Sequence, residues 1–346
     1  MKRLYIDKIK SILIRSTNWI GDAVMTTPAI RAIRKNFPHS EISILVKPWV
    51  SPVFENNPHI DRLILYNSES RHKGLIGKFR LARDLRQYTF DAAILLQNAF
   101  EAALIAFLSG IPCRIGFNTD ARGLLLSHPV PCGFEIKSVH QTQYYLSIIE
   151  GVGLGTDGQD LDLVVNEEYK QRALEIFDQL GISKSDRLVG INPSATFGPA
   201  KQWFSDRYAR LSDKIQEVFG ARVIFFGGPE DQVLGKIISQ ITRHPPIDLC
   251  GKTDLGEAMA LIQQCNLFIT NDSGLMHVAA ALDVPLISIF GSTNPVTTGP
   301  WSSRSRIVRV PIECSPCLKP ECPEEHLSCM DRIGVDKVFE AVKEML

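Results

Sequence analysis

The spacing of hydrophobic positions divides the chain into short apolar runs that alternate with helical patterns. In the first half, runs rich in β-branched residues predict strands at 11–16, 41–46, 63–66 and 91–96. Apolar residues recur at helical spacing between them, as at 75–86 and 99–109. Strands that alternate with helices are typical of a parallel α/β sheet.

The same alternation restarts after a Gly- and Asp-rich segment at 151–162, which we interpret as an interdomain linker. Strands are predicted at 188–192, 222–227, 267–271 and 285–290, and helices at 206–219, 231–242, 255–264 and 275–282. A chain of 346 residues also exceeds one ordinary core. We therefore predict two nucleotide-fold domains with a ligand cleft between them, at the carboxyl ends of their strands.

Composition narrows the classes of function. The chain has 38 Lys and Arg against 38 Asp and Glu, so no excess of positive charge predicts binding of nucleic acid. Charges interrupt each apolar run of the N-terminal stretch MKRLYIDKIKSILIRS, and no run of about 18 apolar residues follows. We expect a cytoplasmic protein without a signal peptide. The glycine fingerprint of NAD-binding enzymes is missing, which disfavours an oxidoreductase.

The first candidate loop, STNWIGD, follows the first predicted strand. It contains Asn18, Gly21 and Asp22. A strand-to-helix loop lies at the ligand edge of such a sheet, where Gly21 permits close backbone approach. Asp22 is then a candidate for chemistry, with helix capping as the structural alternative.

The second candidate loop, NPSATFGPAKQW, follows the first strand of the second half. Its small and hydroxyl-bearing residues, Thr196 among them, leave amides and hydroxyls available for phosphate oxygens, and Lys201 adds a positive charge. A solvated surface lysine is the alternative. After the next strand, Glu230 is a candidate for binding ribose hydroxyls, or else a carboxylate at a helix start.

The third candidate is the turn TNDSGLMH, where Asp272, Ser273 and Gly274 separate a strand from a helix. The amides and the positive dipole at a helix start favour an anion. Ser273 and His277 are four residues apart, so they share one helix face. A helix cap with a core histidine is the structural alternative.

Three stretches together resemble glycosyltransferase family 9, which includes the lipopolysaccharide heptosyltransferases. They are NWIGDAVMTTPAIRAIR, NPSATFGPAKQW and TNDSGLMHVAAALDVPLISIFGSTNP, and they span nearly the whole chain. The resemblance implies a GT-B fold, with two Rossmann-like domains whose parallel sheets face an interdomain cleft. It implies an acceptor-binding domain over 1–160, a donor-binding domain over 161–330, and a final helix in 331–346 that packs back on the first domain.

The resemblance also implies an activity. Family members invert the anomeric carbon as they move L-glycero-D-manno-heptose from ADP-heptose to the inner core of lipopolysaccharide, here to its first heptose, without a required metal cofactor. By motif, Asp22 matches the base that accepts the proton of the acceptor hydroxyl. Asn18 and Gly21, in the same loop, are candidate substrate-binding residues. Matches to donor-binding positions are Thr196, Lys201, Glu230, Asp272, Ser273, Gly274 and His277.

The acceptor implied by the family is an anionic lipid A-core glycolipid at a membrane surface. Segment 68–86 has six basic residues against Glu69 and Asp84. Such a helix is suited to an anionic glycolipid on the inner face of the inner membrane. A solvated helix face is the alternative.

Four cysteines near the C-terminus form a separate pattern, Cys314, Cys317, Cys322 and Cys329, with His326 among them. They supply enough ligands for a tetrahedral zinc site. Their spacing is not that of a common zinc ribbon, and the resemblance implies no metal here. We favour reduced packed thiols or redox-sensitive thiols over structural zinc, and assign no metal ligand.

Two other functions compete with this interpretation. One is a family member that uses another heptose acceptor or another nucleotide sugar. The other is a non-catalytic nucleotide-binding protein, against which the presence of Asp22, Lys201 and the 272–277 turn argues. The sequence does not specify an oligomeric state.

Overall fold

The computed structural model describes residues 6–346, and the chain divides into two compact units that meet at Val164 and Val165. The boundary expected at 160 therefore lies four residues later. The first five residues, part of the charged N-terminal stretch interpreted above, lie outside the described residues.

The first unit contains a six-stranded parallel sheet in the order β3-β2-β1-β4-β5-β6. The strands are β1 Ser11–Arg15, β2 Glu41–Val46, β3 Arg62–Leu65, β4 Ala92–Leu95, β5 Cys113–Phe117 and β6 His128–Val130. The central strands are buried on both faces, so they read as continuous apolar runs. β5 and the short edge strand β6 were not predicted.

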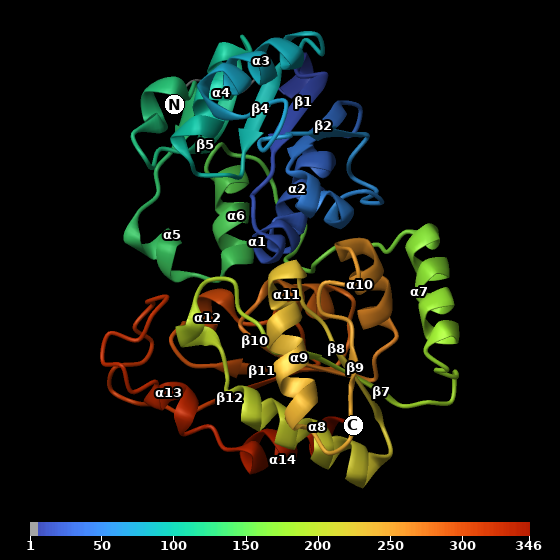
Figure 1. Ribbon diagram of the computed structural model, residues 1–346. Helices are drawn as coiled ribbons and strands as arrows, with labels where there is room; N and C mark the ends of the chain where they lie inside the picture. The colour runs from blue at the N-terminus through green and yellow to red at the C-terminus, as the bar shows by residue number, and fades with distance from the viewer. Residues whose placement is uncertain (1–5) are drawn as a thin grey trace. The chain divides into compact units, whose positions relative to one another are not determined.

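Helices cover both faces of this sheet (Figure 1). They are α1 Ile20–Met25, α2 Thr27–Asn36, α3 Gly74–Arg86, α4 Phe100–Leu108, α5 Phe134–Ser138 and α6 Gln141–Glu150. Short 3-10 helices lie at Ile6–Lys8, Pro48–Val53 and Arg122–Leu125. Leu81 and Leu85 of α3 pack in one core with Leu13 and Leu95, whereas α2 packs against α6.

The second unit repeats the architecture with the order β12-β11-β10-β7-β8-β9, again parallel. Its strands are β7 Leu188–Asn192, β8 Arg222–Phe225, β9 Ile247–Asp248, β10 Leu267–Asn271, β11 Leu286–Phe290 and β12 Ser305–Arg309. Its helices are α7 Glu167–Gln179, α8 Ser205–Phe219, α9 Gln232–Ile241, α10 Leu255–Gln263, α11 Gly274–Ala281, α12 Pro295–Thr298, α13 Ser328–Asp331 and α14 Val335–Met345, with 3-10 turns at Pro199–Lys201 and Pro229–Asp231. The expected α/β class with two Rossmann-like domains is confirmed.

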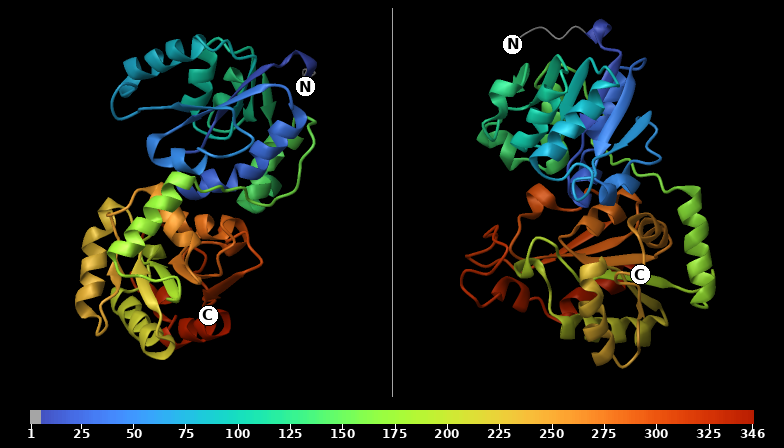
Figure 2. Two further views of the ribbon diagram at one scale, coloured as in Figure 1. Left: turned by 90° about the vertical axis from the view of Figure 1, so that its right-hand side faces the viewer. Right: turned by 45° about the horizontal axis from the view of Figure 1, so that its top comes forward.

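The last helix, α14, belongs to the second unit. It packs against α8, β11 and β12 of that unit. Figure 2 shows this red helix beside α8. Its apolar stripe, with Val338 and Val342, lies in the same core as Ile215 and Ile287. Burial of that stripe fixes the helix where the sheet already offers an apolar face.

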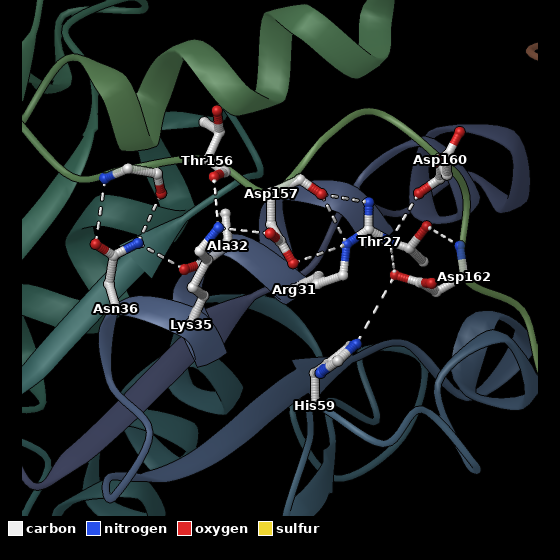
Figure 3. Close-up of polar contacts among 11 residues, drawn as sticks. Thr27, Arg31, Ala32, Lys35, Asn36, His59, Thr156, Asp157, Asp160 and Asp162 are labelled. Carbon is white, nitrogen blue, oxygen red and sulfur yellow. Dashed lines mark hydrogen bonds and ion pairs between the residues drawn. The ribbon is translucent and has the colours of Figure 1, made fainter.

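The linker after α6 is bonded to α2 for most of its length (Figure 3). Arg31 donates to the backbone carbonyls of Asp157, at 3.0 and 3.1 Å, and of Asp160, at 2.9 Å, and it pairs with the carboxylate of Asp162. Asn36 both donates to the carbonyl of Gly155 and accepts from its amide. The linker is therefore an ordered part of the first unit up to Asp162.

Candidate active site

In the first unit, Asp22 lies in the first turn of α1, immediately after the loop that follows β1. The N-cap of this helix is Trp19, which makes no side-chain capping bond, so Asp22 is not the cap that the structural alternative required. Gly21 is buried beside it. Asn18 is fixed from two sides, because its side-chain oxygen accepts from Arg15 at 2.8 Å and its carbonyl accepts from Trp49 at 3.0 Å.

One partner of the Asp22 carboxylate is the hydroxyl of Tyr145, on α6. Burial raises the pKa of Tyr145 well above its ordinary value, and the charge and hydrogen bond of Asp22 raise it further. The hydroxyl therefore stays protonated and donates to the carboxylate. Sequence reasoning missed Tyr145, because it lies more than 100 residues from Asp22 in a helix with no distinctive motif.

Two buried cations lie at the carboxyl ends of neighbouring strands in the same unit. Arg15 ends β1, and burial lowers its pKa to about 10. Lys47 follows β2, and burial, then repulsion by Arg15, lowers its pKa. The Lys47 nitrogen lies 4.0 Å from the ring centre of Tyr66. Glu101 offsets part of both charges, but it also binds Tyr66 at 2.5 Å and Lys78 at 2.6 Å, so this edge of the sheet remains positive.

In the second unit, the structure brings Lys201 and Asp272 together. The Lys201 nitrogen lies 2.8 Å from Oδ2 of Asp272, and both side chains are largely buried, with 14% and 6% exposed. Thr298 also donates to the same oxygen, at 3.4 Å. Lys201 is therefore not the solvated surface lysine of the alternative interpretation. Its positive charge is held at the start of α11.

The turn after β10 places Ser273 at the N-cap of α11, where its hydroxyl accepts from the amide of Met276 at 3.4 Å. Gly274 begins the helix, and His277 is buried one turn later. A helix cap and a buried histidine are also what the structural alternative predicts. The feature that this alternative does not explain is the buried carboxylate of Asp272 against Lys201.

Asn271, the last residue of β10, connects the two loops. Its side-chain amide nitrogen donates to the carbonyl of Pro193 at 2.9 Å, and its side-chain oxygen accepts from the backbone amide of Trp203 at 3.1 Å. These bonds fix both ends of the loop that carries Lys201. Asn271 was part of the quoted turn but was not singled out, since a buried asparagine gives no signal of its partners in the sequence.

Two predicted residues lie apart from this arrangement. Thr196 is exposed in the loop after β7, and Glu230 is exposed in the 3-10 turn after β8. The carboxylate that organises this second turn is the next residue, Asp231, which accepts from the amide of Gly228 at 2.7 Å and from Ser194 at 2.9 Å. No three His, Cys, Asp or Glu side chains of residues 6–346 already form a metal-ligand set.

Two parallel α/β units, with a lysine held at a helix start in one and a helix-borne aspartate in the other, form the framework of a GT-B glycosyltransferase. Residues 78–328 match the model of glycosyltransferase family 9, the heptosyltransferases. The chain belongs to this family, and it is a glycosyltransferase.

Particular relatives cover nearly all of the chain. It is 30% identical over 348 residues to lipopolysaccharide heptosyltransferase 2 of Escherichia coli K12, covering 97% of this chain and 98% of that protein. It is 28% identical to lipooligosaccharide heptosyltransferase 2 of Haemophilus ducreyi, covering 97% and 99%.

Solved structures agree. ADP-heptose LPS heptosyltransferase II of E. coli matches with a TM-score of 0.82 and 27% identity, over 97% of this chain and 98% of that one. A family 9 glycosyltransferase from Veillonella parvula matches with a TM-score of 0.87 and 27% identity, over 97% of each chain.

Proposed function

We propose that this protein is an inverting heptosyltransferase that transfers L-glycero-D-manno-heptose from ADP-heptose to the first heptose of the lipopolysaccharide inner core. The observation that carries the proposal is the buried Lys201–Asp272 pair at the start of α11, in a chain that belongs to the heptosyltransferase family. The heptosyltransferase 2 relatives support the choice of donor and acceptor.

On the donor side, negative charge develops on the diphosphate as the bond to the sugar breaks. Lys201, the hydroxyl of Ser273 and the first-turn amides of α11 supply positive charge and hydrogen-bond donors for that charge. Asp272 holds Lys201 in place until the diphosphate replaces or shares its contact. We propose that these groups suffice, so that added Mg²⁺ leaves turnover unchanged.

On the acceptor side, Asp22 accepts the proton of the attacking hydroxyl. Tyr145 orients the carboxylate, because its hydroxyl donates to one of the oxygens. The buried cations Arg15 and Lys47 provide a positive environment for the anionic groups of an inner-core acceptor. Their place at the carboxyl ends of β1 and β2 is where parallel sheets bind ligands.

We further propose that α3 places the protein on an anionic membrane surface. Leu75, Ile76 and Phe79 are 72%, 77% and 60% exposed on this helix. Exposed basic side chains lie around them on α3 and just before it, at Arg71, Lys73, Arg80, Arg83 and Arg86. Apolar residues with a basic surround are suited to a peripheral helix on anionic lipid. No helix of residues 6–346 is long and apolar enough to span a bilayer.

The experiment that tests the function is a transfer assay with ADP-heptose and lipid A core that already carries one heptose. We expect ADP release that depends on the acceptor, and a product heavier by one heptosyl unit. Acceptor without the heptose, and the donors ADP-glucose and UDP-glucose, serve as comparisons. Equal turnover with the unheptosylated acceptor, or with another donor, would replace the assigned substrate. Binding of ADP without turnover of any pair would indicate a non-catalytic protein.

A further inference from the structure

The segment between β12 and α13 contains no helix or strand from residue 310 to residue 327. Three of the four late cysteines lie in it, and Cys329 lies in α13. Two, four and six residues separate successive cysteines. A segment of this length lacks the regular backbone hydrogen bonds of a helix or sheet, so other contacts must hold it in place.

All four thiols line one small cavity of about 20 Å³, together with His326 and Ser292. A space of this size holds a single water-sized body. The Ser292 side chain is 1% exposed, and its hydroxyl has no hydrogen-bond partner among residues 6–346. A buried hydroxyl left without a partner beside a cavity points to a small polar occupant.

Cys329 is buried, and Cys317 and Cys322 are partly buried. The four cysteines are free thiols in the structure. Four soft sulfur ligands around one small cavity are the donor set of a tetrahedral thiophilic cation.

We propose that Cys314, Cys317, Cys322 and Cys329 bind one thiophilic divalent cation, of which Zn²⁺ is the model. No three of the described His, Cys, Asp or Glu side chains are placed to hold a metal ion, so binding requires the sulfurs to turn toward the centre of the cavity. Each thiol that becomes a ligand releases its proton to solvent, and no oxidant is involved. This proposal reverses the preference for metal-free thiols that the sequence alone supports.

The site would also order the loop that carries Lys201. The carbonyl of Pro320 accepts from the amide of Ala200 at 3.0 Å, and Ala200 itself lines the cavity. A Cβ at Gly198 would lie 2.3 Å from the same carbonyl oxygen, so only glycine allows the contact. The amide of Leu318 donates to the carbonyl of Ser292 at 2.8 Å. Metal binding therefore fixes the segment on which the Lys201 turn rests.

Titration of the full-length, reduced protein with Co²⁺ tests the proposal without a variant. Tetrahedral thiolate coordination gives visible d–d bands and a strong near-ultraviolet sulfur-to-metal transition. We expect these to saturate at one ion per chain and to disappear when Zn²⁺ is added. A protein that stays spectrally silent, with all thiols equally reactive with and without Zn²⁺, would overturn the proposal, as would formation of disulfides in place of metal binding.

Two variants locate the ligands. Cys317→Ser and Cys322→Ser should each lower the Co²⁺ absorbance and weaken binding, whereas Cys113→Ala, which removes a half-buried thiol of the first unit, should leave both unchanged. Circular dichroism of each variant checks that the fold persists. Unchanged Co²⁺ spectra in Cys317→Ser and Cys322→Ser would refute the ligand set.

A third measurement concerns the Lys201 loop. We expect the Kd for ADP to rise severalfold when the metal is removed by a chelator, and to return on addition of Zn²⁺. This arm alone rests on the proposed function. If the metal binds but the Kd for ADP does not change, the coupling to the Lys201 loop is refuted and the metal site stands. If the metal-loaded protein binds no ADP at all, the proposed function is contradicted instead.

Discussion

The Lys201 nitrogen lies 2.8 Å from a carboxylate oxygen of Asp272, although the two residues belong to different loops of the second unit. The pair is largely out of solvent, so each charge depends on the other for compensation. A diphosphate that approaches Lys201 must therefore share the lysine with Asp272. Substitutions at these two residues can therefore separate the effect of the charge pair on ADP binding from its effect on the stability of the loops.

Lys201→Met should weaken ADP binding and also destabilise the protein. The loss of a charged contact to phosphate corresponds to about 1.5–3 kcal/mol, or roughly a tenfold to hundredfold increase in Kd. The uncompensated Asp272 carboxylate should lower the free energy of unfolding by about 3 kcal/mol. Calorimetric titration with ADP and urea denaturation measure the two effects.

The double variant Lys201→Met, Asp272→Asn separates these two effects. Removing the orphaned charge should restore most of the stability but none of the ADP affinity. Lys214→Met is the matched control, since Lys214 pairs with the exposed Asp336 in the same unit and should change neither quantity appreciably. Full ADP affinity in the double variant would remove Lys201 from the donor site.

Asp22→Asn should abolish most turnover and leave ADP binding intact. Loss of a general base lowers the rate by roughly 10²–10⁴-fold, and asparagine keeps an oxygen that can accept from Tyr145. ADP release with the heptosylated acceptor, beside calorimetric ADP binding, gives the result. Turnover that survives in Asp22→Asn would dismiss Asp22 as the base and keep the transferase.

Tyr145→Phe should reduce kcat by about tenfold, the loss expected for one hydrogen bond to a charged group. Because burial holds the pKa of Tyr145 well above its ordinary value, the wild-type rate should not decline through its ionisation as the pH rises toward 10. The pH profile also distinguishes positioning from packing. Tyr145→Phe should shift the acidic limb upward, since Asp22 loses a donor that favours its charged form. A uniform fall at all pH values would indicate a packing role alone.

The sequence predicted the central strands of both sheets because these are buried on both faces and read as unbroken apolar runs. It missed β6 and β9, which are very short, and β12, which is partly exposed. It also missed β5, where Arg114 and Gly116 interrupt the apolar run. It also placed the candidate loops at the strand ends, where α/β topology alone decides the position. It could not identify the partners of Asp22 and Lys201, because contacts across 123 and 71 residues depend on packing.

The exposed apolar face of α3 predicts binding to anionic vesicles. Replacing Ile76 and Phe79 together by Glu should abolish flotation with vesicles of phosphatidylglycerol and phosphatidylethanolamine, because it removes apolar contact and adds negative charge. Turnover of a water-soluble, delipidated acceptor should remain. Val233→Glu is the control, since Val233 is 67% exposed on α9 without a basic surround of this kind. Undiminished flotation of the double variant would show that α3 is not the membrane face.

The contacts of Arg31 with the linker predict which of its residues are held in place. Its guanidinium, 14% exposed, binds two linker carbonyls and the Asp162 carboxylate, so Arg31→Met should lower the free energy of unfolding by roughly 2–4 kcal/mol. It should also increase amide hydrogen exchange across 155–164. Lys35→Met is the matched control. Lys35 binds the same linker through Asp157, but the two side chains are 55% and 41% exposed, so the variant should change stability and exchange little. If Arg31→Met and Lys35→Met release the linker equally, the buried contacts of Arg31 do not determine the order of this segment. If only Arg31→Met does so, the buried contacts of Arg31 hold residues 157–162 in place.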